Sequence, residues 1–297
     1  MSPVPPDGTA PLAEQEAWLR TELDTDPLWR DIDLVAQTGS TNADLAARAA
    51  AGVPQGAVLV ANSQTAGRGR LNRTWTAPPG SSMAFSVLLR PTSDVTAWSW
   101  LPLLTGIAVC TALRSSTGVQ ATLKWPNDVL IDDRKVAGIL TELVGSTDGP
   151  ACVVGCGLNT LMTPDQLPVP TATSLGIEGA FTDQQVTPVV LLAAILRAFS
   201  VLFCQWEAGS GPGPVGRYLD LCSTIGRQVT VSLTDGTQLV GQATGIDPAG
   251  RLEVRTDAGR RTVAAGDVVH ARPRDPGPAA QPGGAALRHS AGPIGQH

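Results

Sequence analysis

The periodicity of the apolar residues changes near residue 224, and this change constrains the fold more than any other feature of the sequence. The stretch "PVVLLAAILRAFSVLFCQWE" at 188–207 is apolar on most sides and indicates a buried helix. From 224 onward, "IGRQVTVSLTDGTQLVGQATG" alternates apolar and polar residues, and turns follow at 235–236, 248–250 and 258–259. Alternation broken by regular turns predicts a small all-β unit, a barrel or sandwich, over residues 222–272.

The residues before this unit mix two kinds of pattern. Helical patterns cover 12–23, 40–52, 98–117 and 188–207, and strand-like runs cover 56–64, 83–91, 122–131, 135–144 and 151–159. We therefore expect one domain of helices and strands over 25–221. Residues 1–24 are expected to form a partly disordered extension, and the Pro/Gly/Ala-rich residues 273–297 a disordered tail.

Composition excludes several classes of protein. The 297 residues carry a net charge of −5, whereas general nucleic-acid binders usually carry a basic excess. Arg197 and Gln205 interrupt the most apolar stretch, so we expect no membrane span. The first residues lack a basic start and an apolar run, which argues against a secretory signal. Five cysteines without CxxC spacing indicate reduced thiols and a cytoplasmic protein.

Glycines and arginines alternate in "TAGRGRLNRTW", a predicted loop at 65–75 that follows a strand-like run. Its glycines let the backbone approach a ligand closely, while Arg68 and Arg70 offer forked donors that suit phosphate or carboxylate. Trp75 adds an aromatic face for a purine base. The loop predicts a site for an anionic nucleotide, and a flexible basic loop is the alternative. Because no P-loop pattern occurs, a nucleotide would bind in another way.

Charged residues gather at a predicted bend in "KWPNDVLIDDRKVAGIL". Pro126 cannot continue a central strand, so Asn127 and Asp128 are free to point into a cleft. Lys135 begins the next strand across a short turn, so that Lys124, Asp128 and Lys135 can meet at one mouth. The alternative is an ordinary hairpin with charged residues at its turn.

Two further stretches place polar residues or glycines at the ends of elements. Ser40 and Thr41 precede a helix, where they either cap it or leave its N–H groups open to a ligand. The glycines of "VVGCGLN" would let a flat ligand pack on the strand beside Asn159, unless they serve only sheet packing.

Taken together, these stretches resemble the biotin–protein ligase family. "GSTN", "QTAGRGRxxRxW", "KWPNDV", "RKVAGIL" and "GxGLN" occur in that family's order and spacing, over residues 35–272. Asn72 departs from the glycine that many members carry, but Asn adopts positive φ more readily than most residues. The resemblance implies an α+β fold, with a mixed or antiparallel sheet, helices on one side of it, and a small C-terminal β-barrel. The short segment before residue 35 favours the monofunctional type without an N-terminal DNA-binding domain.

The resemblance also implies a reaction in which biotin and magnesium-ATP form biotinyl-5′-AMP, which a lysine of a biotin carboxyl carrier domain then attacks. Lys135, Arg68 and Asp128 would be catalytic, and Asp128 would also help to place magnesium with ATP. The residues expected to contact biotin are Ser40, Thr41, Asn42, Gln64, Gly67, Arg68, Lys135, Gly138 and Gly157. Those expected to contact ATP or the adenylate are Arg70, Arg73, Trp75, Lys124, Asn127 and Asn159, with Arg272 as a further candidate for the phosphates.

Cationic groups suit this reaction because its first step brings two anions together, a carboxylate and the α-phosphate. The resemblance implies no tightly bound prosthetic group, no nucleic acid or membrane partner, and a monomer or weak homodimer. Two alternatives stay open: a lipoate or octanoate ligase or transferase on the same fold, and a biotin sensor without a transfer step.

Overall fold

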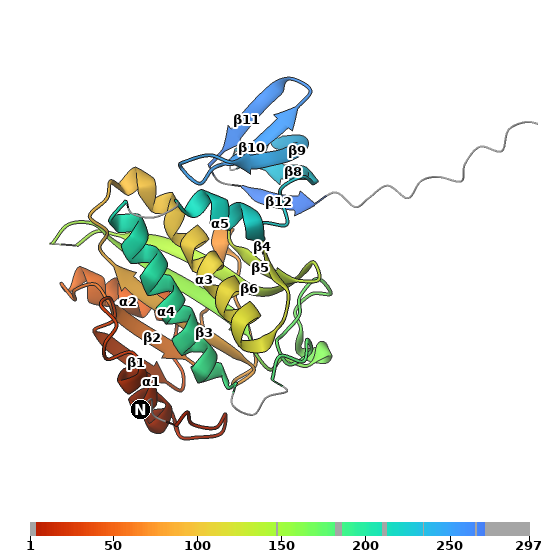
Figure 1. Ribbon diagram of the computed structural model, residues 1–297. Helices are drawn as coiled ribbons and strands as arrows, with labels where there is room; N and C mark the ends of the chain where they lie inside the picture. The colour runs from red at the N-terminus through yellow and green to blue at the C-terminus, as the bar shows by residue number, and fades with distance from the viewer. Residues whose placement is uncertain are drawn as a thin grey trace, which may run out of the picture.

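The computed structural model contains two separate β-sheets with helices packed around the larger one (Figure 1). It describes residues 4–146, 148–181, 186–209, 213–233, 235–264 and 266–270. Arg272 and the predicted tail at 273–297 lie outside these residues. Of the N-terminal segment that the sequence predicts to be partly disordered, Pro6 is buried and its carbonyl oxygen accepts a hydrogen bond from Thr187.

The larger sheet has seven strands in the order β1-β2-β3-β7-β6-β5-β4. Their bounds are β1 Asp31–Val35, β2 Ala57–Ala61, β3 Ser82–Leu89, β4 Ala121–Lys124, β5 Asp128–Ile131, β6 Arg134–Val144 and β7 Ala151–Asn159. All neighbours pair antiparallel except β1 and β2, which are parallel. The predicted mixed sheet is thus confirmed, although the short β1 was not among the expected strands.

Helices cover both faces of this sheet, whereas the expectation was one face. Alternate residues of a strand point to opposite faces. In β2, Val58 and Val60 belong to the core formed with α3 (Trp100–Thr117) and α4 (Pro188–Glu207), together with residues of α1 (Leu12–Glu22). Ala57 and Leu59 pack instead with α2 (Thr41–Ala50) in a second, smaller core. This placement brings the N-terminus of α2 against the middle of the sheet.

Local sequence explains where the helices begin and end. The Ser40 hydroxyl caps α2 by accepting a hydrogen bond from the Ala43 N–H. Gly118, at a φ of 74°, ends α3 in the left-handed conformation that glycine adopts readily. Pro188 opens α4, and Pro214 opens the short α5 (Pro214–Leu221). Three single-turn 3₁₀ helices, η1 (Arg70–Asn72), η2 (Val95–Ser99) and η3 (Pro164–Gln166), lie in the connections.

The C-terminal sheet is antiparallel but open, so the predicted closed barrel is not confirmed. Its order is β11-β10-β9-β8-β12. The bounds are β8 Gln228–Ser232, β9 Gln238–Ile246, β10 Leu252–Thr256, β11 Gly259–Val263 and β12 Asp267–His270. Closure would require β11 to pair with β12, and in the described residues it pairs only with β10. Four of the five residues of β11 are exposed, so this strand lacks the apolar inner face that a closed barrel buries.

The small sheet is fixed to the larger domain by buried tryptophans. The Trp100 Nε1 donates to the Pro248 carbonyl oxygen at 2.8 Å, and the Trp125 Nε1 donates to that of Gly250 at 3.1 Å. Trp125 is 1% exposed and lies in the break between β4 and β5. The predicted interruption at Pro126 therefore separates two strands, and Trp125 within it holds the small sheet beside them.

Two segments are long and apolar enough to cross a membrane, by length and composition alone: Val95–Thr117 and Pro188–Glu207. In the folded chain, 67% and 56% of their most apolar windows are buried. Most of the apolar side chains of α3 and α4 belong to the main core, so core packing accounts for their composition.

Candidate active site

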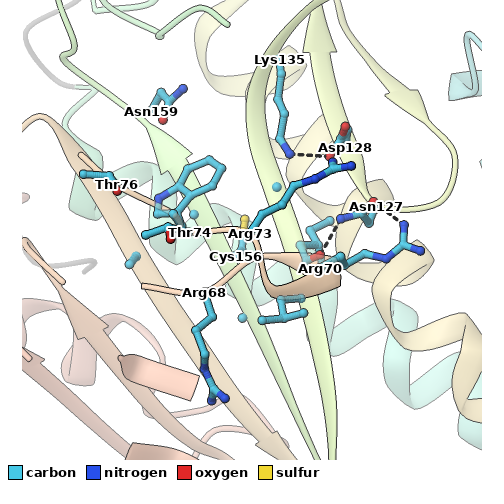
Figure 2. A pocket seen from close by; sticks show the side chains of 18 of the residues that line it. Arg68, Arg70, Arg73, Thr74, Thr76, Asn127, Asp128, Lys135, Cys156 and Asn159 are labelled. Atoms are coloured by element: carbon cyan, nitrogen blue, oxygen red, sulfur yellow. Dashed lines mark hydrogen bonds and ion pairs between the residues drawn. The ribbon is translucent and has the colours of Figure 1, made fainter. Parts of the chain in front are cut away.

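One cavity of about 430 Å³ lies where α2, the strands β5, β6 and β7, and the loop 67–76 meet. Its walls also include residues 168–172 and Asp267 of the small sheet. Figure 2 shows the charged side chains of this cavity. We distinguish two ends of the cavity. The α2 end is formed by Ser40, Thr41, Asn42 and Gln64, with Ser86 buried behind them, and the cationic end is formed by Arg70, Arg73, Asp128 and Lys135.

The α2 end is a buried network of neutral polar groups. The Thr41 backbone N–H donates to the Gln64 Oε1 at 2.8 Å, which ties the helix start to the chain beyond β2. The Ser86 hydroxyl lies 2.7 Å from the Thr41 Oγ1 and 2.6 Å from the Asn42 Oδ1. Ser86 is 0% exposed and Asn42 is 5% exposed. Since these groups are buried and hydrogen-bonded to one another, their positions are fixed by the fold.

Glycines along β6 and β7 bring the backbone close to the groups that line the cavity. A Cβ atom on Gly157 would lie 2.4 Å from the Trp75 ring, and one on Gly138 would lie 2.8 Å from the Lys135 Nζ. A Cβ on Gly155 would lie 2.0 Å from the Asn42 Oδ1. A larger residue at any of these positions would displace the side chain that now packs on it, so the glycines shape the floor of the cavity.

The Lys135–Asp128 pair is the centre of the cationic end. In the register of β5 and β6, Asp128 pairs with Gly138 and Lys135 pairs with Leu130. The Lys135 side chain reaches along the strands, so that its Nζ lies 2.6 Å from the Asp128 Oδ1. The backbone of Lys135 is held from the other side, because its N–H donates to the Thr171 carbonyl oxygen at 2.7 Å. Its Nζ also lies 5.6 Å from the centre of the Trp75 ring, within range of a cation–π contact.

The arginine loop folds back on itself as a tight hairpin. The Gly69 N–H donates to the Arg73 carbonyl oxygen at 2.7 Å, and the Trp75 N–H donates to that of Gly67 at 2.9 Å. At the tip, Asn72 has a φ of 58°, as its expected tolerance of positive φ allows. Leu71 has a φ of 54°, a conformation that costs a non-glycine residue roughly 1–2 kcal/mol.

Each arginine of the loop has a different partner. The Arg68 Nη2 lies 3.2 Å from the Glu142 Oε2, and Arg73 forms an ion pair with Asp267. The Arg70 Nη1 donates to the Asn127 Oδ1 at 3.1 Å and to the Gly266 carbonyl oxygen at 3.3 Å. Burial lowers the pKa of the Arg70 guanidinium, although its ordinary value leaves it charged at neutral pH. The loop is thus held against the small sheet at two points.

Most of the residues predicted from sequence meet in this cavity. Those that line it are Ser40, Thr41, Asn42, Gln64, Arg68, Arg70, Arg73, Trp75, Asn127, Asp128, Lys135, Gly138, Gly157 and Asn159. Gly67 does not line the cavity; it packs against the Trp75 backbone, where a Cβ atom would lie 2.4 Å from the Trp75 carbonyl oxygen. Lys124 is not part of the lining. It lies near His270, whose pKa is lowered to about 4, mainly by burial and then by the positive charges of Arg227 and Lys124.

Several residues of the site were not predicted. Glu142 and Ser86 contact Asn42, and Asp267 reaches the cavity from the small sheet. Cys156 lies in the wall between two glycines, and burial raises the pKa of its thiol to about 12, so it stays protonated. The sequence does contain a signal for Glu142. It is a carboxylate in "GILTELV", a strand-like run that is otherwise mostly apolar, and charged residues are rare in such positions unless they are paired.

The carboxylates of the site allow a limited role for a metal ion. Within the described residues, no group of three or more His, Cys, Asp or Glu side chains could hold a metal alone. Asp128 and Asp267 are carboxylates at the cationic end, and they already face Lys135 and Arg73. The site offers these two carboxylates to a magnesium ion that would arrive with the phosphates of a nucleotide.

The fold and the cavity define a ligase-type catalytic domain with an attached small sheet, and the comparisons with known proteins agree. Residues 35–159 match the model of the Biotin/lipoate A/B protein ligase family, and residues 224–271 match that of the Biotin protein ligase C terminal domain. The chain belongs to this family.

The relatives of the chain are biotin ligases. It is 42% identical over 251 residues to a biotin–[acetyl-CoA-carboxylase] ligase of Mycobacterium tuberculosis, covering 82% of this chain and 90% of the relative. A ligase of the same name from Paracoccus denitrificans is 36% identical over 79% of this chain and 98% of its own length. The structure of biotin protein ligase from Aquifex aeolicus in complex with biotin and ATP matches 82% of this chain and 100% of its own, with a TM-score of 0.68 and 27% identity.

Proposed function

We propose that this protein is an ATP-dependent biotin–protein ligase, which forms biotinyl-5′-AMP and transfers biotin to a lysine of a biotin carboxyl carrier domain. The observation that carries the proposal is the composition of one cavity, which joins a buried neutral end at α2 to a cationic end at Lys135. This arrangement suits a molecule whose polar ring lies at the α2 end and whose apolar tail leads to a carboxylate at the cationic end. The identity with biotin–[acetyl-CoA-carboxylase] ligases supports the same reading.

The α2 end suits the ureido ring of biotin. Ser40, Thr41, Asn42 and Gln64 supply hydroxyl and amide groups that both donate and accept hydrogen bonds. The burial of their network fixes these groups before a ligand arrives, which reduces the entropy lost on binding. Gly138 and Gly157 let the Lys135 and Trp75 side chains pack closely on β6 and β7, and the aliphatic tail would lie beside these side chains.

The cationic end suits the two anions of the first step. An oxygen of the biotin carboxylate attacks the α-phosphorus of ATP, and the bond to the bridging oxygen breaks as pyrophosphate leaves. Lys135, with Arg70 and Arg73, would reduce the repulsion between the carboxylate and the phosphates and stabilise the charge of the transition state. A magnesium ion bound to the phosphates would neutralise further charge, with Asp128 as its protein carboxylate.

The second step needs a neutral amine at the same place. The carrier lysine loses a proton, its nitrogen attacks the carbonyl carbon of the mixed anhydride, and the C–O bond to AMP breaks. Asp128 is the candidate acceptor for the lysine proton, since its carboxylate faces the cavity beside Lys135. Trp75 is the candidate to stack on adenine, with Asn127 and Asn159 as its hydrogen-bonding neighbours.

The remaining assignments concern the whole chain. We place the catalytic domain at 25–221 and the small domain at 222–272, and we propose that the protein acts in the cytoplasm as a monomer or weak homodimer without nucleic acid. We keep Gly67 as a support of the loop and assign Lys124 no contact with ATP, because it lies outside the cavity lining.

Incubation of the purified protein with biotin, magnesium-ATP and a biotin carboxyl carrier domain tests this function. Mass spectrometry should show the addition of one biotinyl group to one carrier lysine, dependent on ATP, and excess lipoate should not compete with labelled biotin. An unmodified carrier, or modification by lipoate at an equal rate, would contradict the proposal.

A further inference from the structure

Glu142 is a carboxylate of β6 that contacts the α2 end and the arginine loop at once. Its Oε2 accepts a hydrogen bond from the Asn42 Nδ2 at 2.8 Å and from the Arg68 Nη2 at 3.2 Å. Both donors therefore share one oxygen atom. The side chain of Glu142 is 27% exposed, whereas that of Arg68 is 49% exposed. Glu142 thus stands between a buried network and a partly exposed loop.

The hydrogen bonds of Asn42 fix the direction of that network. Its Nδ2 faces two acceptors, Glu142 and the Leu140 carbonyl oxygen, so the other atom of the amide must be the oxygen. That Oδ1 can only accept, so Ser86 gives its single hydroxyl proton to Asn42. The Thr41 hydroxyl lies 2.7 Å from the Ser86 hydroxyl and 3.1 Å from the Gln64 Oε1, and both of these oxygens can accept its proton. A continuous series of polar contacts then runs from Thr41 through Ser86 and Asn42 to Glu142.

The position of Asn42 leaves little room for another arrangement. A Cβ atom on Gly155 would lie 2.0 Å from the Asn42 Oδ1, so the amide packs directly on the backbone of β7. A ligand that contacts Thr41 or Asn42 at the α2 end would therefore act on Glu142 through groups that cannot move aside.

The side chain of Arg68 lies apart from the other loop arginines. Figure 2 shows it pointing away from Arg73, Asp128 and Lys135. Arg70 and Arg73 contact the small sheet, so Arg68 is the arginine of the loop that contacts β6 through a side chain. Arg68, which the sequence predicts to be catalytic, also ties the loop to β6 through this contact.

We propose that Glu142 is a positioning residue that couples occupation of the α2 end to the placement of the arginine loop. The pair with Arg68 is weak while it is half exposed, because water screens it. A ligand at the α2 end lies beside Arg68, which lines the cavity, and shields its pair with Glu142 from water, which strengthens the hold of Glu142 on Arg68. The inference rests on the proposed function, since it takes biotin as that ligand.

Hydrogen exchange of residues 65–75, with and without saturating biotin, tests the coupling in the full-length protein. Four proteins are compared: the wild type, Glu142→Gln, Arg68→Gln and the double variant. Glutamine keeps an acceptor for Asn42 but removes the charge that faces Arg68. Biotin should slow exchange of the loop in the wild type, and this protection should fall roughly three- to tenfold in Glu142→Gln. The double variant should lose no more than either single variant.

Glu253→Gln is the matched control, because it removes the carboxylate of an Arg260 ion pair in the small sheet, outside the cavity lining. It should leave loop protection unchanged. Biotin affinity, measured by calorimetry, separates the outcomes: if the wild type binds no biotin, the proposed function fails. If biotin binds but protects the loop equally in the wild type and Glu142→Gln, or protects it in neither, or if the single losses add in the double variant, the coupling role of Glu142 is wrong.

Discussion

At the α2 end of the cavity, neutral groups are buried and hydrogen-bonded to one another, whereas at the cationic end more exposed charged side chains form ion pairs with half-buried carboxylates. Ser86 is 0% exposed and Asn42 is 5% exposed. By contrast, the side chains of Lys135 and Arg73 are 34% and 66% exposed. The difference indicates that the first end is ready for a ligand and that the second rearranges around one.

The ion pairs of the cationic end explain why rearrangement is required. Arg73 faces Asp267 and Lys135 faces Asp128, so carboxylates now hold the cations that an incoming phosphate needs. Each pair must weaken before the cation can neutralise a ligand. A nucleotide can replace these carboxylates, because its phosphates offer the same cations a stronger negative charge.

The largest effect should come from the cationic end. Lys135→Ala removes the ammonium expected between the carboxylate and the α-phosphate, and pyrophosphate release should slow by roughly 10²–10³-fold. Biotin affinity should change much less, because the α2 end stays intact. Stopped-flow detection of pyrophosphate and calorimetry of biotin binding measure the two quantities. Unchanged turnover would remove Lys135 from the chemistry.

Two glycines of β7 provide a matched pair for the comparison. Gly155→Ala would place a methyl group against the fixed amide of Asn42, and we expect it to lower the free energy of unfolding by roughly 1–3 kcal/mol. Gly157→Ala would meet the Trp75 ring, which belongs to the loop and can move aside. Its effect should stay below about 1 kcal/mol. Denaturant unfolding of both variants measures this, and equal losses would mean that the loop is as fixed as the α2 end.

A smaller effect is expected where the loop meets the small sheet. Asp267→Asn removes the charge that holds Arg73, so trypsin should cut the ligand-free loop between Arg68 and Arg73 roughly two- to fivefold faster. Biotin with ATP should protect both proteins, because the bound phosphates replace the lost carboxylate. Equal cleavage with and without ligands would show that the loop does not close over the site.

The sequence predicted those parts of the site that lie in short local patterns. The glycine-arginine loop, the break at Pro126 and the helix start at Ser40 each encode their own geometry, and each lies at the end of an element. Asp267 could not be predicted, since it meets Arg73 across 194 residues of sequence and only through the docking of the small sheet. The side of the sheet that α2 covers could not be predicted either, because it too depends on how segments distant in the sequence pack together.

The open C-terminal sheet and the strand β1 could not be predicted, because both depend on which strands pair with each other. The alternation over the C-terminal stretch predicts a small barrel, yet four of the five residues of β11 are exposed and its outer edge stays unpaired within the described chain. Strand β1, "DIDLV", is short and polar in part, and its parallel contact with β2 gives it a place in the sheet.

The most direct test of the whole account is the release of pyrophosphate in the absence of any carrier protein. When the enzyme is mixed with biotin and magnesium-ATP, we expect a burst of one pyrophosphate per active site, after which biotinyl-AMP stays bound and is detected by mass spectrometry. A burst that requires biotin would show that this cavity joins a carboxylate to AMP. Absence of the burst, or an equal burst without biotin, would contradict the account.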